Sequence, residues 1–66
     1  MKIQNIYLIP GDTFKVGDDS STYTFINISK NDRYGFDELN ASNEFGGVSS
    51  FRIDTMDSNG LFLKKN

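Results

Sequence analysis

The stretch Thr22-Tyr23-Thr24-Phe25-Ile26-Asn27-Ile28-Ser29 decides the fold, because it is the strongest strand signal in this chain of 66 residues. β-Branched and aromatic residues fit the pleated, half-buried surface of a sheet. Alternation gives the strand two faces, with Tyr23 and Phe25 on one and Thr24, Ile26 and Ile28 on the other. Apolar groups on both faces leave two interpretations open. The strand is either central and covered on both sides, as in a closed barrel with an oligomer contact, or it carries a bulge that switches its sides, as in a monomeric barrel.

Two further strands are predicted before this stretch. Residues 3–9 form a first strand that ends at Pro10-Gly11-Asp12, because proline cannot donate to a ladder and glycine tolerates the turn. Residues 13–16 form a second strand, with Phe14 and Val16 on one side. Residues 17–21 carry a dense turn signal.

The second half of the chain predicts less regular structure. Residues 34–39 suit either a strand or one helical turn, and residues 40–47 read as a polar loop with Phe45 at its tip. Residues 48–56 alternate as a strand. Its inward face is expected to hold Phe51, Ile53 and Thr55, and its other face Ser50, Arg52, Asp54 and Met56.

A hairpin is predicted to join the last two strands. Residues 57–61 suit a three-residue loop with Gly60 in the left-handed position, so residues 61–65 would pair with residues 48–56. This register places Leu61 and Leu63 toward the core and Phe62 outward.

These elements predict one all-β domain over residues 1–66. Five short strands with no room for a crossover helix favour a small SH3-like barrel or an antiparallel five-stranded meander. The aromatic residues expected in its core are Tyr7, Phe14, Tyr23, Phe25 and Phe51.

Small size makes a partner subunit the expected source of extra stability. A domain of this length buries only about 60% of the surface of its unfolded chain. The chain has no cysteine and no histidine, so disulfides and thiolate or imidazole metal sites are closed to it. We therefore expect a homo-oligomer, with no cofactor and no metal.

Three segments resemble a known group of proteins. Residues 11–17 (GDTFKVG), residues 23–28 (YTFINI) and the segment from Asn40 through residues 46–51 (GGVSSF) resemble small SH3-like β-barrel proteins of unassigned role in tailed-phage genomes. The resemblance implies an accessory protein made in the host cytoplasm during infection, one that blocks or redirects a host factor. It carries over no catalytic motif.

No catalytic constellation is visible in the sequence. Nucleophilic pairs of Cys or Ser with His cannot form. The adjacent carboxylates Asp18-Asp19 and Asp37-Glu38 would point to opposite faces of a strand, so they do not make a facing acid–base pair. We therefore expect a protein that is not an enzyme.

Aromatic and arginine side chains in polar, glycine-containing segments form the candidate partner-binding surface. Loops held on a rigid scaffold often carry function, and interface anchors are enriched in Tyr, Phe and Arg. The candidate residues are Arg33, Tyr34, Phe36, Phe45 and Arg52. An alternative is that these rings fold back and cap the ends of the barrel.

The leading functional hypothesis is a non-enzymatic protein that acts through protein–protein contacts, as a modulator or inhibitor of a host factor. The first alternative is an oligomeric binder or sponge for a small anionic, nucleotide-like ligand, held by Arg33 or Arg52 between subunits. The lesser alternative, a nucleic-acid-binding barrel, is disfavoured because seven basic and nine acidic side chains give a net charge of −2. The apolar run at residues 6–9 is too short for a signal peptide or a membrane span, which predicts a cytoplasmic protein.

Overall fold

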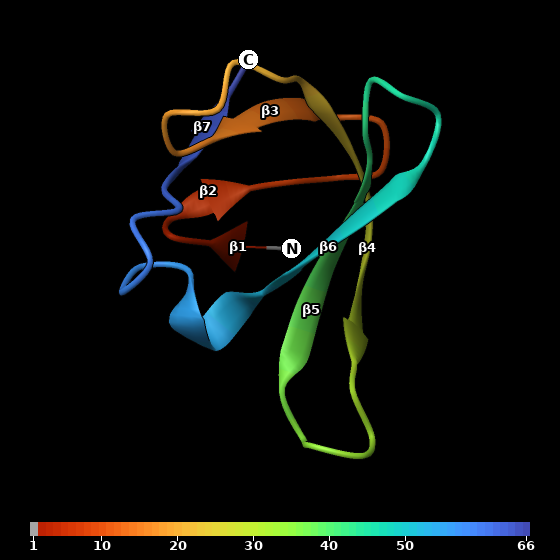
Figure 1. Cartoon of the computed structure of the whole chain (residues 1–66), viewed down its shortest axis with the longest axis vertical. Helices are drawn as coiled ribbons and strands as arrows, with labels where there is room; N and C mark the ends of the chain where they lie inside the picture. The colour runs from red at the N-terminus through yellow and green to blue at the C-terminus, as the bar shows by residue number, and fades with distance from the viewer. Residues whose placement is uncertain (1) are drawn as a thin grey trace.

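Seven short strands and one turn of 3-10 helix make up residues 2–66, the part of the chain that the computed structural model describes. The strands form a five-stranded sheet in the order β6-β5-β4-β3-β7 and a separate hairpin, β1–β2 (Figure 1). All pairs are antiparallel, so the expected all-β class is confirmed. The elements are β1 Lys2–Ile3, β2 Ile6–Tyr7, β3 Thr13–Val16, β4 Tyr23–Lys30, β5 Asp37–Ser42, β6 Val48–Arg52, η1 Ile53–Thr55 and β7 Leu63–Lys65.

The five-stranded sheet is a curled meander with one added strand. Strands β3, β4 and β5 each pair with the next strand in the chain, and β7 returns to pair with the other side of β3. In Figure 1, β4 and β5 run along the long axis while β3 crosses above them, so the sheet bends around its inner face. Within residues 2–66 no pairing joins β6 to β7, so the sheet stays open and does not close into a barrel.

A bulge in β4 explains the apolar residues on both of its faces. The register with β5 shifts between Phe25 and Asn27, which leaves Ile26 in the irregular position and 38% exposed. Past the shift, Ile28 returns to the core side, where it packs against the buried cluster. Of the two interpretations of this strand, the bulge is therefore confirmed.

Strand β5 corrects the prediction of a loop over residues 40–47. Of the alternatives for residues 34–39, the strand is the one formed, but it starts at Asp37 and runs on to Ser42. Leu39 and Ala41 point inward and are fully buried. Asn40 points to the outer face, and its polarity hid the strand from a reading based on composition.

The predicted strand over residues 48–56 ends early, at Arg52. The 3-10 turn η1 follows, closed by a bond from the Met56 N–H to the Ile53 carbonyl of 3.3 Å. The outward placement of Met56 was wrong, because this turn breaks the alternation and leaves the residue 1% exposed. Phe51 and Ile53 pack against the core as expected.

The predicted hairpin between the last two strands is also wrong. Strand β7 pairs with β3, with Val16 opposite Leu63, and not with β6. The turn at η1 directs the chain away from β6, and a bond from the Leu61 N–H to the Met56 carbonyl of 2.8 Å closes a wider connection. Gly60 does take the left-handed conformation, at φ +72°. Leu63 is buried and Phe62 points outward, as predicted.

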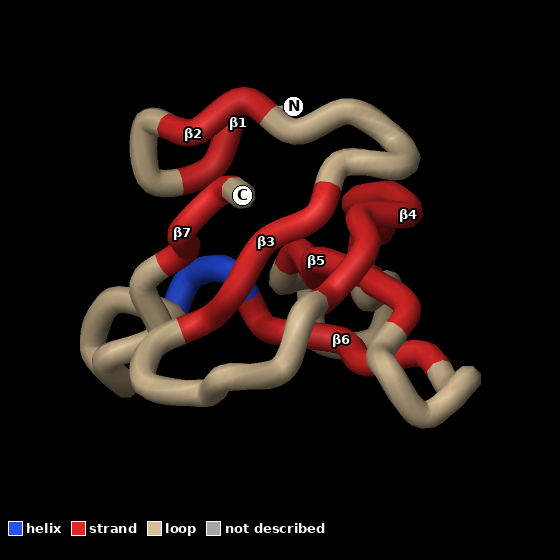
Figure 2. Tube along the Cα trace, turned by 90° about the horizontal axis from the view of Figure 1, so that it is seen from above, coloured by secondary structure: helices blue, strands red, loops and turns tan. Residues whose placement is uncertain are grey.

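The predicted first strand, residues 3–9, is broken into a hairpin by a left-handed turn. Gln4 and Asn5 have φ of +53° and +65°, so the chain reverses between β1 and β2. The side-chain amide of Gln4 then bonds to the outer edge of β7 in the way that the backbone of a neighbouring strand would. Its Nε2 donates to the Leu61 carbonyl (3.0 Å) and its Oε1 accepts from the Leu63 N–H (2.7 Å). Figure 2 shows the hairpin lying next to β7.

One apolar cluster lies between the inner face of the sheet and the hairpin. The rings of Phe14 and Tyr23 stack at 5.8 Å, and Tyr23 meets Phe51 edge-on at 5.4 Å. The expectation for Tyr7 was wrong, because the turn in the hairpin leaves its ring 66% exposed. The buried residues are Ile3, Leu8, Phe14, Val16, Tyr23, Phe25, Leu39, Ala41, Met56 and Leu63.

Across residues 2–66, no helix is long and apolar enough to span a membrane.

Candidate functional site

The turn between β4 and β5 presents two of the predicted site residues. The Asn31 side-chain oxygen accepts the N–H groups of Arg33 and Tyr34, each at 3.1 Å. Gly35, at φ +76°, closes the turn with a 2.7 Å bond from its N–H to the Asn31 carbonyl. These bonds hold the backbone in place, so Arg33 and Tyr34 extend from a defined turn.

Four of the five predicted site residues form one continuous cluster, which we call the arginine–aromatic cluster: Arg33, Tyr34, Phe36 and Arg52. The rings of Tyr34 and Phe36 stack with centroids 6.1 Å apart and planes 10° apart. The Arg33 guanidinium carbon lies 5.2 Å from the centroid of Tyr34, and that of Arg52 lies 4.3 Å from the centroid of Phe36. Both cations therefore lie within the usual range of cation–π attraction.

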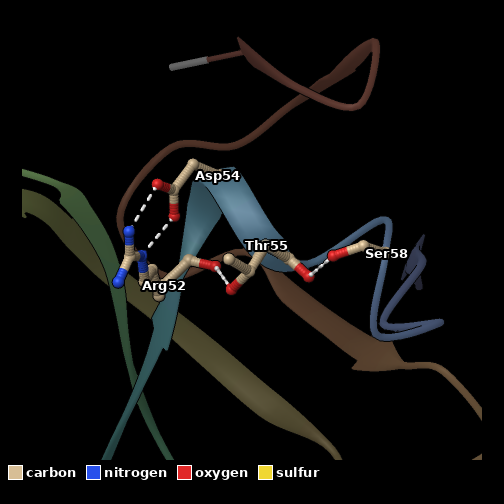
Figure 3. Close-up of polar contacts among 4 residues, drawn as sticks. All are labelled: Arg52, Asp54, Thr55 and Ser58. Carbon is tan, nitrogen blue, oxygen red and sulfur yellow. Dashed lines mark hydrogen bonds and ion pairs between the residues drawn. The ribbon is translucent and has the colours of Figure 1, made fainter.

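The Arg52 side chain is held by Asp54 as well as by Phe36. Its Nε and Nη2 donate to the two carboxylate oxygens of Asp54 at 2.6 and 2.9 Å (Figure 3). This hydrogen-bonded pair lowers the pKa of Asp54 and raises the pKa of Arg52. The bidentate pair limits the rotation of the guanidinium, whose central carbon lies over the Phe36 ring.

The backbone beside this pair is stabilised by hydroxyl groups from η1 and the following turn. The Thr55 Oγ1 donates to the Arg52 carbonyl at 3.4 Å, and the Ser58 Oγ donates to the Thr55 carbonyl at 3.0 Å (Figure 3). The end of β6 is therefore tied into the next turn, which supports the position of Arg52.

Phe45, the fifth predicted residue, lies apart from the cluster, in the turn at the other end of β5. Its ring is 89% exposed. The Asn43 side-chain oxygen accepts the N–H groups of Phe45 (2.9 Å) and Gly47 (3.0 Å), and the Glu44 carboxylate accepts the Thr22 N–H at 2.7 Å. The structure thus offers an exposed aromatic side chain on a well-bonded turn.

The outer face of β4, β5 and β6 between these two regions is polar and internally bonded. The Asn40 Nδ2 donates to the Asn27 Oδ1 and to the Ser29 Oγ, both at 2.8 Å, and the Ser50 Oγ donates to the Asn40 Oδ1 at 2.6 Å. The predicted loop over residues 40–47 placed Asn40 outside the sheet, so this network was not predicted. Its signal was the polar residue at every second position of residues 38–42.

Exposed Val48 is a further contact residue that the prediction missed. It is 66% exposed at the start of β6, on the same strand face as Ser50 and Arg52. The predicted outer face of residues 48–56 held Ser50, Arg52, Asp54 and Met56, and Val48 was not among the candidate contact residues.

The alternative that the loop rings cap the ends of a barrel does not describe Tyr34 or Phe45, which are 67% and 89% exposed. Phe36 is half-buried, under the Arg52 guanidinium.

Residues 2–66 enclose no pocket and contain no group of three or more Asp or Glu side chains that could hold a metal ion. The ligand-binding alternative therefore needs a pocket formed between copies. No known protein family, curated protein sequence or solved structure matches this chain.

Proposed function

We propose that this chain is a non-enzymatic binding protein that contacts a protein partner through the arginine–aromatic cluster and Phe45. The single observation that carries the proposal is the ordered stack of two exposed arginines and two rings at the β4–β5 turn. Aromatic and arginine side chains dominate the energetics of protein interfaces, and ordering before binding reduces the entropy lost on association.

The chemistry of the cluster defines the partner surface. Tyr34 offers an exposed ring, and its neighbour Arg33 offers guanidinium donors that suit carbonyl or carboxylate groups. Arg52 is already paired with Asp54, so its contribution is the flat apolar face of the stack and not a free charge. The complementary surface is therefore apolar at its centre with acceptor groups beside it.

The strand arrangement supports an SH3-like character as part of this proposal. The order β6-β5-β4-β3-β7, with a 3-10 turn between the last two strands, is that of an open five-stranded sheet curled on one core. The resemblance to small phage proteins of this type supplies the partner class, a factor of the host cell, and with it a place in the host cytoplasm.

Affinity capture with matched variants tests the function. The full chain is immobilised and exposed to a bacterial lysate, beside Tyr34→Ala, Phe45→Ala and the control Phe62→Ala. Phe62 is 54% exposed but lies outside the proposed surface. We expect a specifically retained protein whose binding falls about tenfold or more with each of the first two variants, a loss of ~1.4 kcal/mol or greater. Equal retention by all four proteins would contradict the proposal.

A further inference from the structure

The two outer edges of the five-stranded sheet differ in how their backbone groups are covered. The edge of β7 is occupied by the Gln4 amide, and β7 also carries Lys64 and Lys65, which discourage pairing with another strand. The edge of β6 has no strand beside it within residues 2–66, and its sequence Val-Ser-Ser-Phe-Arg contains no proline or lysine. Edge strands without such protection are templates for pairing with another strand.

The hydrogen-bond pattern shows which residues of β6 offer free backbone groups. The Asn43 N–H donates to the Gly47 carbonyl at 2.9 Å, which makes residues 43 and 47 a bonded pair of the β5–β6 hairpin. Bonded and non-bonded pairs alternate along an antiparallel ladder. By this alternation and the register of β5 and β6, Ser49 and Phe51 bond to β5, while Val48, Ser50 and Arg52 direct their N–H and C=O groups outward. The Arg52 carbonyl also accepts the 3.4 Å bond from the Thr55 Oγ1, and its second lone pair is the one that faces a partner strand.

We propose that the open edge of β6 pairs with the same edge of a second copy of this chain, antiparallel and about a twofold axis at Ser50. Ser50 is the midpoint of Val48–Arg52, so this register pairs the whole strand. Ser50 meets the partner's Ser50, and Val48 meets the partner's Arg52, in three bonded pairs. The contact is isologous, as in most homodimers.

The spacing of the two Arg52–Asp54 pairs favours this register over the neighbouring one. A twofold axis at Ser50 sets the two Arg52 residues four positions apart along the joined strands, or about 14 Å at ~3.4 Å per residue. An axis at Phe51 would set them two positions apart, about 7 Å, where two Arg52 side chains, each held by Asp54, would crowd each other. The Ser50 axis also avoids the turn residues Gly46 and Gly47, which an axis at Ser49 would need as strand partners.

The dimer brings together the two parts of the candidate surface that lie apart in one chain. The exposed Val48 side chain falls beside the partner's Arg52, which is stacked on the partner's Phe36. The turn that carries Phe45 then extends along the end of the partner's β6. The joined sheet has two sides at which the central strands end. On each of these sides, the Phe45 turn of one copy would lie next to the arginine–aromatic cluster of the other copy. The pairing itself goes beyond the proposed function and does not depend on the identity of a protein partner.

Single cysteines test the register, because the chain has no cysteine of its own. Ser50→Cys places two thiols in a bonded antiparallel pair with Cα atoms ~5.5 Å apart, within the range that a disulfide spans. Val48→Cys is the matched control on the same strand, since its two copies would be too far apart to link. We expect oxidation to convert most of the Ser50→Cys protein to a covalent dimer, at least fivefold more than for Val48→Cys. An equimolar mixture of Val48→Cys and Arg52→Cys should form the mixed dimer.

The wild-type chain provides the second readout. Light scattering at increasing concentration should show the molar mass rise toward twice the 7.5 kDa of one chain. A constant monomer mass, or equal cross-linking of Ser50→Cys and Val48→Cys, would overturn the proposal. Ser50→Cys linked to a foreign protein in the expression-host lysate, and not to itself, would overturn it too, in favour of a partner strand. None of these results depends on the affinity-capture experiment, so the two proposals can fail separately.

Discussion

At the scale of single residues, Gly17 joins two turns that are far apart in the sequence. Its φ is +58°, and its N–H donates to the Phe62 carbonyl at 2.8 Å. A Cβ added here would lie 3.1 Å from the Gly60 carbonyl oxygen, closer than ordinary van der Waals contact. The residue therefore serves both the backbone conformation and the close approach of the last turn.

We expect Gly17→Ala to lower the free energy of unfolding by about 2 kcal/mol, from the left-handed backbone and the close contact together. The matched control is Gly46→Ala, because Gly46 has φ +83° and open space around its Cα. This control should lower the free energy of unfolding by about 1 kcal/mol, because alanine is disfavoured in the left-handed conformation. Urea denaturation of both variants measures the difference, and equal losses would show that the contact with Gly60 has no effect.

The Asp19–Tyr23 hydrogen bond makes stability depend on pH at both extremes. The Ser21 N–H, followed by the Tyr23 hydroxyl, lowers the pKa of Asp19, and the bond to Asp19 raises the pKa of Tyr23. The stabilisation that Asp19 contributes is present above pH 3.8, the pKa of the unfolded chain. It is lost as pH falls through the lower pKa of the folded protein. The stabilisation that Tyr23 contributes is present below pH 10.0, the pKa of the unfolded chain. It is lost as pH rises through the higher pKa of the folded protein.

Thermal melting across the pH range checks these signs. We expect Tyr23→Phe to flatten the fall in Tm above pH 10 and Asp19→Asn to flatten part of the fall below pH 4. A Tyr23→Phe profile that is parallel to wild type on the alkaline side would argue against a stabilising role for the bond.

At the scale of elements, local residue pattern was sufficient for some strands and not for others. Strand β4 was predictable because its aromatic and β-branched residues mark a strand, and its apolar residues on both faces left the bulge as one of two interpretations. Strand β5 was hidden because Asn40 and Ser42 face outward and dominate the composition. The partner of β7 could not be predicted, since the 3-10 turn η1 that sends the chain to β3 has no strong local signal.

The candidate surface shows the same division. Arg33, Tyr34 and Phe36 are close in sequence, so their proximity was predictable. The arrival of Arg52 on Phe36 depends on the register between β5 and β6, in which Glu38 lies opposite Arg52. The separation of Phe45 from the cluster follows from β5 being a strand, and a loop over residues 40–47 did not predict it.

The Gln4 side chain bridges the hairpin β1–β2 to the edge of β7, in addition to the bond from the Lys65 Nζ to the Tyr7 carbonyl of 3.1 Å, and it gives a third prediction. Gln4→Glu keeps the length of the side chain but replaces the donor that serves the Leu61 carbonyl and the Asp57 carboxylate, the latter at 2.6 Å. It therefore leaves the carbonyl without a partner and places two carboxylates in contact. We expect a loss of about 2–3 kcal/mol in the free energy of unfolding, against about 1–2 kcal/mol for Gln4→Ala.

The control for this variant is Asn5→Asp, which adds the same charge at the exposed neighbouring position and should change stability by no more than ~0.5 kcal/mol. Urea denaturation gives the energies, and amide exchange at Leu63 reports the edge directly. If Gln4→Glu were no worse than Asn5→Asp, the side-chain bridge to β7 would be without energetic importance.

At the scale of the whole molecule, the fold depends on one small core that collects residues from every part of the chain. Its largest fully buried side chains are Phe14, Leu8, Leu39 and Met56, from β3, the segment after β2, β5 and the turn after η1. No cysteine is present to add a disulfide. A domain of this length is expected to have a free energy of unfolding of only about 3–10 kcal/mol, so a single core cavity is a large fraction of the total.

Met56 is the sharpest test of this dependence, because strand alternation predicts it on the surface while the fold buries it. Truncation by Met56→Ala removes the side chain from a site that is 1% exposed, and we expect a loss of about 2–5 kcal/mol, enough to unfold much of the protein at 37 °C. Met56→Leu conserves volume and should cost less than ~1.5 kcal/mol. Phe62→Ala, at an outward position, should cost less than the core truncation Met56→Ala. Urea denaturation ranks the three variants, and a Met56→Ala protein as stable as Phe62→Ala would mean that the chain after β6 continues as a strand and not as the 3-10 turn.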